Sequence, residues 1–170
     1  MSYADLVTTR HSVRSYKKTP VEPEKVQAIL EAGRLAPSAV NNQPTRVAVC
    51  DTPEVLSRVA AATGRMERDG SVFGAPLVLV VCVRTEDAWV RGYDQKCHAD
   101  IDATIVCDQM MMQATDLGWE LAGFAILIRL LCERLYRCLK GLSQSMYCLL
   151  AMPTKNPLIW RSTSMVAGFL

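Results

Sequence analysis

The sequence has no long apolar run. Its nearest approach to one is the segment 121–128, which Glu120 and Arg129 confine, whereas a membrane-spanning helix needs about 18 or more uninterrupted apolar residues. The chain also opens without a basic stretch followed by an apolar one, so we expect no secretory leader. These two absences predict a protein that is neither inserted into a membrane nor exported.

Sequence signatures of several enzyme classes are missing as well. There is no Gly-rich phosphate loop of either common type, no GxSxG nucleophile motif and no HExxH zinc motif. Scattered cysteines in apolar runs favour free thiols and a cytoplasmic location. The cysteines are odd in number and show no CxxC or other metal spacing; they are Cys50, Cys82, Cys97, Cys107, Cys132, Cys138 and Cys148.

A strong net charge is also absent, but the charge is unevenly distributed. The chain of 170 residues carries 19 Lys and Arg against 17 Asp and Glu, which argues against a dedicated nucleic-acid-binding protein. Residues 1–118 hold 13 basic and 15 acidic side chains, whereas residues 119–170 hold 6 basic and 2 acidic ones, with no Asp. Leucine rises from 7 in the first part to 11 in the second. We therefore distinguish a regular part, 1–118, from an atypical tail, 119–170.

Helix and strand signals punctuate the regular part. Pro23 fits the first turn of a helix that ends before Pro37, and Asp51 or Thr52 is placed to cap a helix that begins at Pro53. The alternation of helices and strands predicts a layered α/β arrangement with one sheet sandwiched by helices. The predicted elements are helices at 4–9, 23–36, from 53, and 100–117, a short strand at 46–50, and an apolar strand at 76–83 that suits burial on both faces.

The helix at 100–117 is expected to be long and buried. Ile101, Ile105 and Met112 recur at helical spacing, with Met111 beside them, so we expect these side chains on its buried face.

A histidine and two acidic residues lie at the start of this helix. His98 and Asp102 are four positions apart, which is a possible metal-ligand pair, but no second set accompanies them. Asp100 and Asp102 near a helix N-terminus also interact favourably with the helix dipole. We therefore expect no metal site.

Two short segments carry side chains that suit ligand binding. The first places Arg10, Ser12 and Arg14 within five residues, and guanidinium and hydroxyl groups match phosphate oxygens. An exposed polar turn would explain the same residues, and His11 is expected at the surface.

The second segment, 37–44, places small residues and amides between two prolines. Amide side chains both donate and accept hydrogen bonds, which suits a ring that alternates carbonyl and N–H groups. A loop without a ligand is the alternative interpretation.

Taken together, RHSVRSY at 10–16, EAGRLAPSAVNNQPTRVAV at 31–49, and then APLVLVVCV and QMMMQATDLG resemble the nitroreductase family of flavin enzymes. The resemblance covers residues 1–118. It implies an α+β fold with a mixed β-sheet between helices in α/β/α layers, and an intertwined homodimer with FMN at its interface. It also implies transfer of a hydride from NAD(P)H to FMN, followed by reduction of a nitroaromatic compound, a quinone or a similar small acceptor.

Carried over by position, the resemblance assigns FMN contacts but no catalytic side chain. Arg10, Ser12 and Arg14 match the segment that holds the FMN phosphate and ribityl chain. The loop that reaches FMN, usually from the partner subunit, is matched by Pro37, Ser38, Ala39, Asn41 and Gln43.

The resemblance stops after Gly118. The family would continue with a segment like LGTCWI, a strand ending in IGYP and a basic C-terminal segment, and none of these follows. If the gene is read one base earlier from Gly118, permitted synonymous codons turn 118–129 into LGTCWICYFDP and 139–158 into EGVEPVYVLLIGYANEEPAD. Both peptides resemble the family at those places. We therefore interpret the tail as the result of a single-base deletion, or a sequencing error, in or beside the Gly118 codon.

Three functional hypotheses follow. The first is an FMN-dependent NAD(P)H oxidoreductase of nitroreductase type. The second is a non-catalytic, incompletely folded product of a frameshifted nitroreductase gene. The third is a binding module that uses residues 10–16 to hold some other phosphate, an interpretation that the amide-rich loop makes less favourable.

Overall fold

The structure is a computed structural model that describes residues 1–19, 21–63, 67–119, 126–127, 145–148 and 167–168. Every helix and strand predicted within 1–118 is present, and a short 3-10 turn and a small hairpin are added. The helices are α1 (Tyr3–Thr9), α2 (Pro23–Arg34), η1 (Ala39–Asn41), α3 (Pro53–Thr63) and α4 (Ala99–Asp116). The strands are β1 (Thr45–Cys50), β2 (Glu67–Arg68), β3 (Ser71–Val72), β4 (Val78–Val83), β5 (Ile126–Leu127), β6 (Ser145–Cys148) and β7 (Ala167–Gly168).

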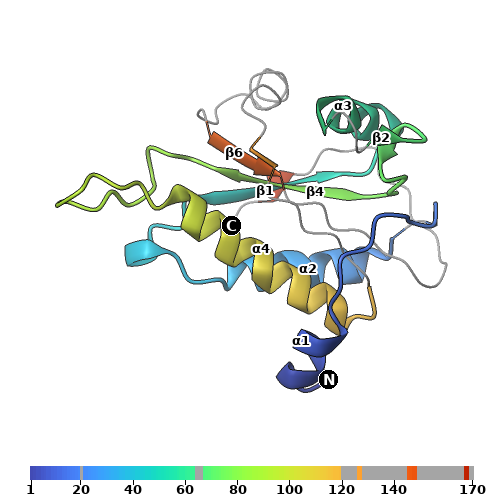
Figure 1. The fold of residues 1–170 in the computed structure, drawn as a ribbon, viewed down its shortest axis with the longest axis horizontal. Coiled ribbons are helices and arrows are strands. Elements are labelled where there is room, and N and C mark those ends of the chain that lie inside the picture. Colours follow the sequence, from blue (N-terminus) through green and yellow to red (C-terminus); the bar gives the residue numbers. More distant parts are fainter. Residues whose placement is uncertain (20, 64–66, 120–125, 128–144, 149–166, 169–170) are drawn as a thin grey trace.

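A sheet of five strands forms the middle layer. Its order is β5-β6-β4-β1-β7, and the two strands that carry most of the pairing, β1 and β4, are antiparallel from Thr45 opposite Val83 to Cys50 opposite Val78. Helices α2 and α4 lie on one face of the sheet, and α3 lies on the other (Figure 1). The α+β class and the helix–sheet–helix layering are therefore confirmed. Among the described strands every pairing is antiparallel, so a parallel pair of the expected mixed sheet is not found in this part.

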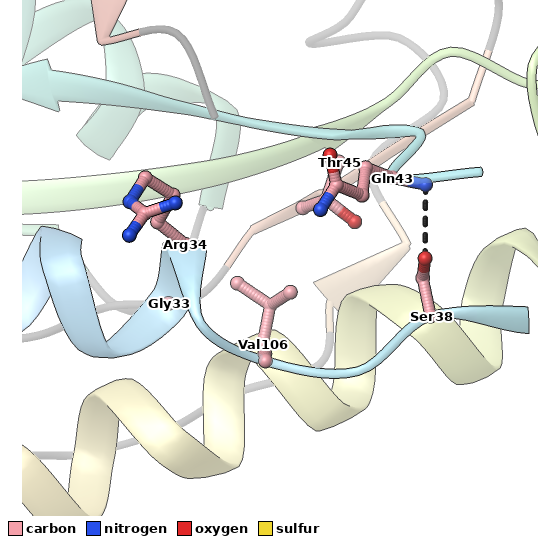
Figure 2. Close-up of a pocket in the computed structure, with 7 residues that line it drawn as sticks. Gly33, Arg34, Ser38, Gln43, Thr45 and Val106 are labelled. Carbon is pink, nitrogen blue, oxygen red and sulfur yellow. Dashed lines mark hydrogen bonds between the residues drawn. The ribbon is translucent and has the colours of Figure 1, made fainter. Parts of the chain in front are cut away.

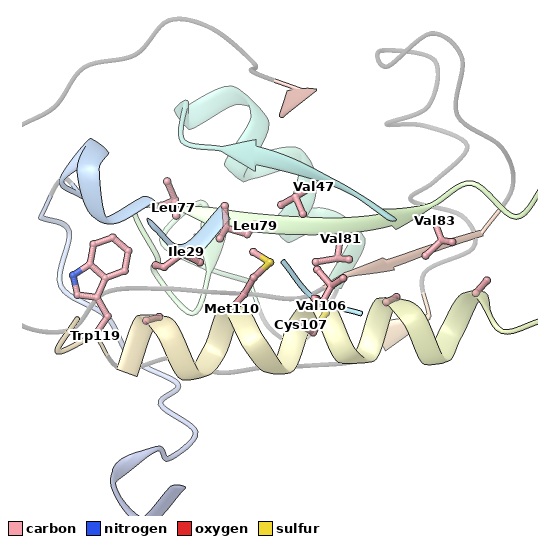
Figure 3. Packing of buried hydrophobic residues seen from close by; sticks show 14 of the residues in the cluster. Ile29, Val47, Leu77, Leu79, Val81, Val83, Val106, Cys107, Met110 and Trp119 are labelled. Atoms are coloured by element: carbon pink, nitrogen blue, oxygen red, sulfur yellow. The ribbon is translucent and has the colours of Figure 1, made fainter. Parts of the chain in front are cut away.

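Strand β4 is buried on both faces, as the apolar run predicts. Leu79, Val81 and Val83 belong to the hydrophobic cluster between the sheet and the helices α2 and α4 (Figure 3). The alternate residues Val80 and Cys82 belong to the second hydrophobic cluster, between the other face of the sheet and α3. Because successive side chains of a strand point to opposite faces, one short apolar run supplies both cores.

Helix α4 buries a different face from the one expected. Ile101 is 38% exposed, and Ile105 is only partly buried. The buried stripe instead contains small residues such as Ala103 and Ala114, with Met110 between them. Small side chains allow α2 to approach closely, and at this crossing Gly33 of α2 lies against the side chain of Met110. Helix–helix contact, rather than the size of the apolar side chains, therefore decides which face is buried.

Local signals set the ends of two helices. The hydroxyl of Thr52 accepts a hydrogen bond from the Val55 N–H at 3.4 Å, so Thr52 is the cap of α3. Helix α4 ends at Asp116 with Leu117 as its C-cap, and the following Gly118 has a φ of 77°, which suits glycine. The N–H of the next residue, Trp119, donates to the carbonyl of Ala114 at 2.9 Å. This bond brings the indole into the core, where Trp119 is 2% exposed.

No helix in the described ranges is both long and apolar enough to span a bilayer.

The contact between Gly33 and Met110 can be tested by a double-mutant cycle. Gly33→Ala should lower the free energy of unfolding by about 1–3 kcal/mol, because a Cβ would lie 2.9 Å from Cγ and Sδ of Met110. Met110→Ala should cost about 2–5 kcal/mol, because the side chain is fully buried. The double variant should cost less than the sum, since the added methyl group occupies space that the thioether leaves. Urea denaturation measures these free energies, and additive values would contradict the close approach of α2 to α4.

The described thiols should differ in reactivity. Cys97 is exposed, whereas Cys50 and Cys107 are buried. Burial, with a smaller contribution from the adjacent carboxylate, raises the pKa of Cys50 and of Cys107 to about 12. Because the thiolate is the nucleophile, iodoacetamide at about pH 8 should alkylate Cys97 roughly 100-fold faster or more than either buried thiol. Peptide mass spectrometry over time measures the rates, and similar rates at the three positions would disprove the burial of Cys50 and Cys107.

Candidate functional site

The amide-rich loop 37–43 joins α2 to β1 beside the N-terminal end of α4 (Figure 1). Three of its residues have positive φ angles, at 46° for Val40, 59° for Asn41 and 48° for Gln43. This left-handed conformation costs a residue with a Cβ roughly 1–2 kcal/mol, and it is unusual for a β-branched side chain such as that of Val40. A loop of this shape persists only where surrounding contacts over-determine it.

Two hydrogen bonds near the base of the loop supply such contacts. The Gln43 N–H donates to the Ser38 hydroxyl at 2.9 Å and closes the loop (Figure 2). The Ala39 N–H donates to a carboxylate oxygen of Asp102 on α4, also at 2.9 Å. The first bond links the two ends of the loop, and the second attaches the loop to the helical layer.

The sequence suggested two roles for Asp102, a favourable interaction with the helix dipole and a possible metal-ligand pair with His98, but no contact with the loop. Asp102 is 1% exposed, and its carboxylate reaches the loop as well as lying in the first turn of α4. The position of Asp102 along α4 could have revealed its contact with the loop. Asp102 lies on the same stripe of the helix as Ala99 and Val106, which is the buried face. An acidic residue on a buried stripe requires a hydrogen-bond donor.

The three amides of the loop differ in their contacts. The side-chain amide of Asn42 donates to the Asp87 carbonyl at 3.0 Å, so it tethers the loop to the segment after β4. Asn41 and Gln43 are exposed, and their side chains form no hydrogen bond with another residue in the described part of the chain. Asn41 and Gln43 are therefore available to a ligand, whereas Asn42 has a structural contact.

A small pocket lies between this loop, the end of α2 and the adjacent part of α4. It encloses about 260 Å³ of empty space that is continuous with solvent, and the buried Thr45 hydroxyl at its wall has no hydrogen-bond partner in the described ranges. Because this volume includes open solvent, the pocket is a shallow hollow that does not by itself enclose a ligand. Its lining residues are Gly33, Arg34, Ala36, Ser38, Gln43, Thr45 and Val106 (Figure 2).

The other candidate residues follow α1. Arg10 caps the C-terminal end of that helix through its backbone N–H, and Ser12 and Arg14 lie beyond it with exposed side chains. Arg68 donates to the Ser15 hydroxyl at 3.3 Å, which connects this segment to the β2–β3 hairpin. Two guanidinium groups and a hydroxyl therefore lie on a stretch of chain that is at least partly accessible to solvent.

The two candidate segments lie near opposite ends of α4. The N-terminal amino group of Met1, just before α1, pairs with Asp116 in the last turn of α4 at 3.3 Å. The Ala39 N–H contacts Asp102 in the first turn. Fourteen residues separate Asp102 from Asp116, which corresponds to about 21 Å along the helix axis. One chain therefore does not bring the two segments together.

Neither histidine lies in a metal-like cluster. His11 is exposed, as predicted, and its Nδ1 lies 3.0 Å from the Thr9 carbonyl. The His98 ring packs against Trp89, with ring centroids 4.6 Å apart. Within the described residues no group of three or more His, Cys, Asp or Glu is placed to hold a metal ion.

Comparison with known proteins relates this geometry to a family. A family model described as the nitroreductase family matches residues 7–66, a range that includes both candidate segments. The NADH dehydrogenase of Thermus thermophilus is 41% identical over 95 residues, which are 54% of this chain and 43% of that protein. The chain spans only 43–61% of the length of the curated relatives that it matches.

Solved structures extend the likeness. A nitroreductase family protein from Clostridium difficile is 30% identical, with a TM-score of 0.74 over 94% of this chain and 88% of that one. A nitroreductase with bound FMN from Bacteroides fragilis has a TM-score of 0.68 over 100% of this chain and 98% of that one. At 19% identity, the second structure shows likeness of fold only.

The strain at Val40 should be measurable. Val40→Gly removes a left-handed penalty of roughly 1–2 kcal/mol and adds about 0.5–1 kcal/mol of chain entropy, so the free energy of unfolding should stay the same or rise. Val90 is a matched control because it is an exposed valine with an ordinary φ, in an isolated bridge to Cys97. Val90→Gly should lower the free energy of unfolding by roughly 0.5–1 kcal/mol. Chemical denaturation compares the two, and an equal loss in both variants would contradict strain at Val40.

Proposed function

This chain belongs to the nitroreductase family, and from that premise we propose that its regular part is half of an FMN site in an NAD(P)H-dependent oxidoreductase. The acceptors proposed are nitroaromatic compounds, quinones or similar small molecules. The proposal is supported by the two candidate segments, by the NADH dehydrogenase among the relatives and by FMN in a structure of similar fold. We include a cytoplasmic location in the proposal, which the free thiols among the described cysteines support.

The segment after α1 is proposed to bind the phosphate end of FMN. Arg10 and Arg14 offer planar guanidinium groups that match phosphate oxygens, and Ser12 offers a neutral donor for the phosphate or the ribityl chain. Arg10 and Ser12 form no side-chain hydrogen bond with the described residues, so they can turn to an anion without losing one. The donor set fits the charged end of the cofactor.

The loop 37–43 is proposed to contact the flavin of a partner subunit. The free amides of Asn41 and Gln43 suit the carbonyl and N–H groups at the ring edge. The rest of the loop brings these amides to the surface through Pro37, Ser38 and Ala39. The observation that carries this step is that the N-terminus before α1 and the loop contact opposite ends of α4, at Asp116 and Asp102, which lie about 21 Å apart along the helix axis. A twofold homodimer, in which each subunit lends its loop to the other, would join the two segments.

Bound FMN would supply the redox chemistry by accepting a hydride and passing it to the acceptor. The residues of the chain have other tasks. Arg10 and Arg14 bind and orient the phosphate, while Asn41 and Gln43 orient the ring edge. No side chain is needed as a nucleophile, and we propose none.

Retention of FMN tests the proposal directly. The purified chain mixed with FMN should keep flavin absorbance after desalting. Arg10→Ala should weaken FMN binding by roughly 10–100-fold, since a hydrogen bond to a charged group contributes about 1.5–3 kcal/mol. Fluorescence titration measures the dissociation constant.

Arg91→Ala is the control, because Arg91 is a partly exposed arginine that pairs with Asp94 and belongs to neither segment. It should leave FMN binding unchanged. A colourless protein would disprove FMN binding, and equal effects of the two substitutions would disprove the role of Arg10.

A second candidate is that this chain is the non-catalytic product of a frameshifted nitroreductase gene. The specific observation in its favour is that family-like peptides reappear when the codons after Gly118 are read one base earlier. The length of the matches also supports it, since the curated relatives align over only 95–121 residues. In this case the chain would lack a later strand, part of the flavin pocket and the segment that clasps the partner.

The coding DNA and a repaired gene distinguish the two candidates. Bases around Gly118 that are incompatible with LGTCWICYFDP would disprove the frameshift. If the frameshift is real, insertion of one base in the Gly118 codon should give a yellow dimer on sizing chromatography, while the chain as it stands should elute without flavin. A yellow dimer formed by the unrepaired chain would contradict the second candidate.

A further inference from the structure

A buried carboxylate without an ionic partner is the least expected feature of the described core. Asp102 is 1% exposed, although acidic side chains are rarely buried unless they are paired. No ion pair joins Asp102 to a cation in the described ranges, and its Oδ2 has no hydrogen-bond partner there. Its other oxygen, Oδ1, accepts the hydrogen bond from the Ala39 N–H at 2.9 Å. The hydrogen bond from the loop therefore offsets part of the free-energy cost of burying this carboxylate.

The position of Ala39 makes this bond important for the loop. Ala39 directly precedes Val40 and Asn41, two of the three loop residues in the left-handed conformation. The Ser38 hydroxyl, on the other side of Ala39, holds the Gln43 N–H at 2.9 Å. A bond at Ala39 therefore attaches the middle of the strained turn to a helix, whereas the bond from Ser38 only connects the loop to itself.

We propose that Asp102 is the positioning residue of the 37–43 loop. Through the Ala39 N–H it holds the turn that presents the exposed Asn41 and Gln43 side chains to a flavin. The identity of the ligand rests on the proposed function above, but the effect on the conformation of the loop does not. Asp102 itself need not touch the ligand.

Hydrogen exchange of the full chain without FMN tests the conformational step. Asp102→Ala should make the amides of residues 39–43 exchange roughly tenfold faster or more, because the loop loses its attachment to α4. Asp102→Asn should keep the rates within about threefold of the original, since the side-chain carbonyl of Asn can still accept the Ala39 N–H. Exchange followed by mass spectrometry resolves this segment.

Thr115→Ala provides the matched control. Thr115 is also buried on α4, and its hydroxyl donates to the Met111 carbonyl at 2.9 Å near the other end of the helix. Its loss should lower global stability without speeding exchange in the loop. Equal acceleration in the Asp102→Ala and Thr115→Ala proteins would overturn the proposal, because Asp102 would then act only as a core residue.

Binding of FMN provides the second readout. Asp102→Ala should raise the dissociation constant of FMN roughly tenfold, and Asp102→Asn should restore most of the affinity. Loss of loop protection with unchanged affinity would overturn the link to the ligand. If the original chain binds no FMN, the proposed function fails, while the exchange experiment still decides whether Asp102 positions the loop.

Ala39→Pro covers the case in which Asp102→Ala does not fold. Proline removes the N–H donor at the first position of a short helical turn, where its geometry is tolerated. Because Ala39→Pro breaks the same bond from the other side, residues 40–43 should exchange roughly tenfold faster here too. Exchange at the original rate in this variant would show that the bond does not hold the loop.

Discussion

The packing of α4 along one face of the sheet is the constraint on which the rest of the described structure depends. Gly33 allows α2 to approach α4 closely, and Met110 fills the space between the two helices and β4. Once α4 is held in this way, its length sets the distance between the chain segments that contact its first and last turns. The loop 37–43 is attached at Asp102, and the Met1 amino group before α1 pairs with Asp116. The separation of the two candidate segments is a property of a rigid helix.

The same helix carries the polar contact that shapes the loop. A carboxylate inside an apolar layer lowers stability unless its hydrogen-bonding capacity is satisfied. Asp102 uses one oxygen for the Ala39 N–H and leaves the other without a partner among the described residues. The loop in turn holds Val40 in a conformation that costs free energy. Backbone strain at Val40 and a buried carboxylate with one unpaired oxygen thus occur together at the site that we propose for a ligand. Backbone strain of this kind is typical of functional sites.

The end of α4 marks where the regular part of the chain is complete. The N–H groups of Gly118 and Trp119 donate to carbonyls in the last turn of the helix, and the buried indole of Trp119 lies at one end of the core (Figure 3), where the Lys25 ammonium of α2 is 5.7 Å from the ring centroid. The sequence predicts that the resemblance to the family ends at the same place. If the following residues come from another reading frame, the sheet would lose a strand that belongs to the family. Unpaired strand edges promote aggregation, and a native stability of only about 5–15 kcal/mol leaves little reserve.

Elements that depend on local chemistry could be predicted. Pro23 and Pro53 mark helix starts, and the apolar run before Val83 implies a strand buried on both faces. The choice of the buried face of α4 could not be predicted in this way. Ile101 is the larger apolar side chain, but Ala103 is the one that a neighbouring helix can approach closely.

The sequence by itself determined which residue types are present and in what order. The arginines near position 10 and the amides near position 42 indicate anion and ring binding, because guanidinium and amide groups carry that chemistry in any fold. Only the tertiary structure decided that Asn42 is engaged while Asn41 is free, and that Asp102 holds the loop from a helix 63 positions away. It also decided that the two segments lie at opposite ends of α4. Contacts between residues far apart in the chain arise from packing, which no local pattern specifies.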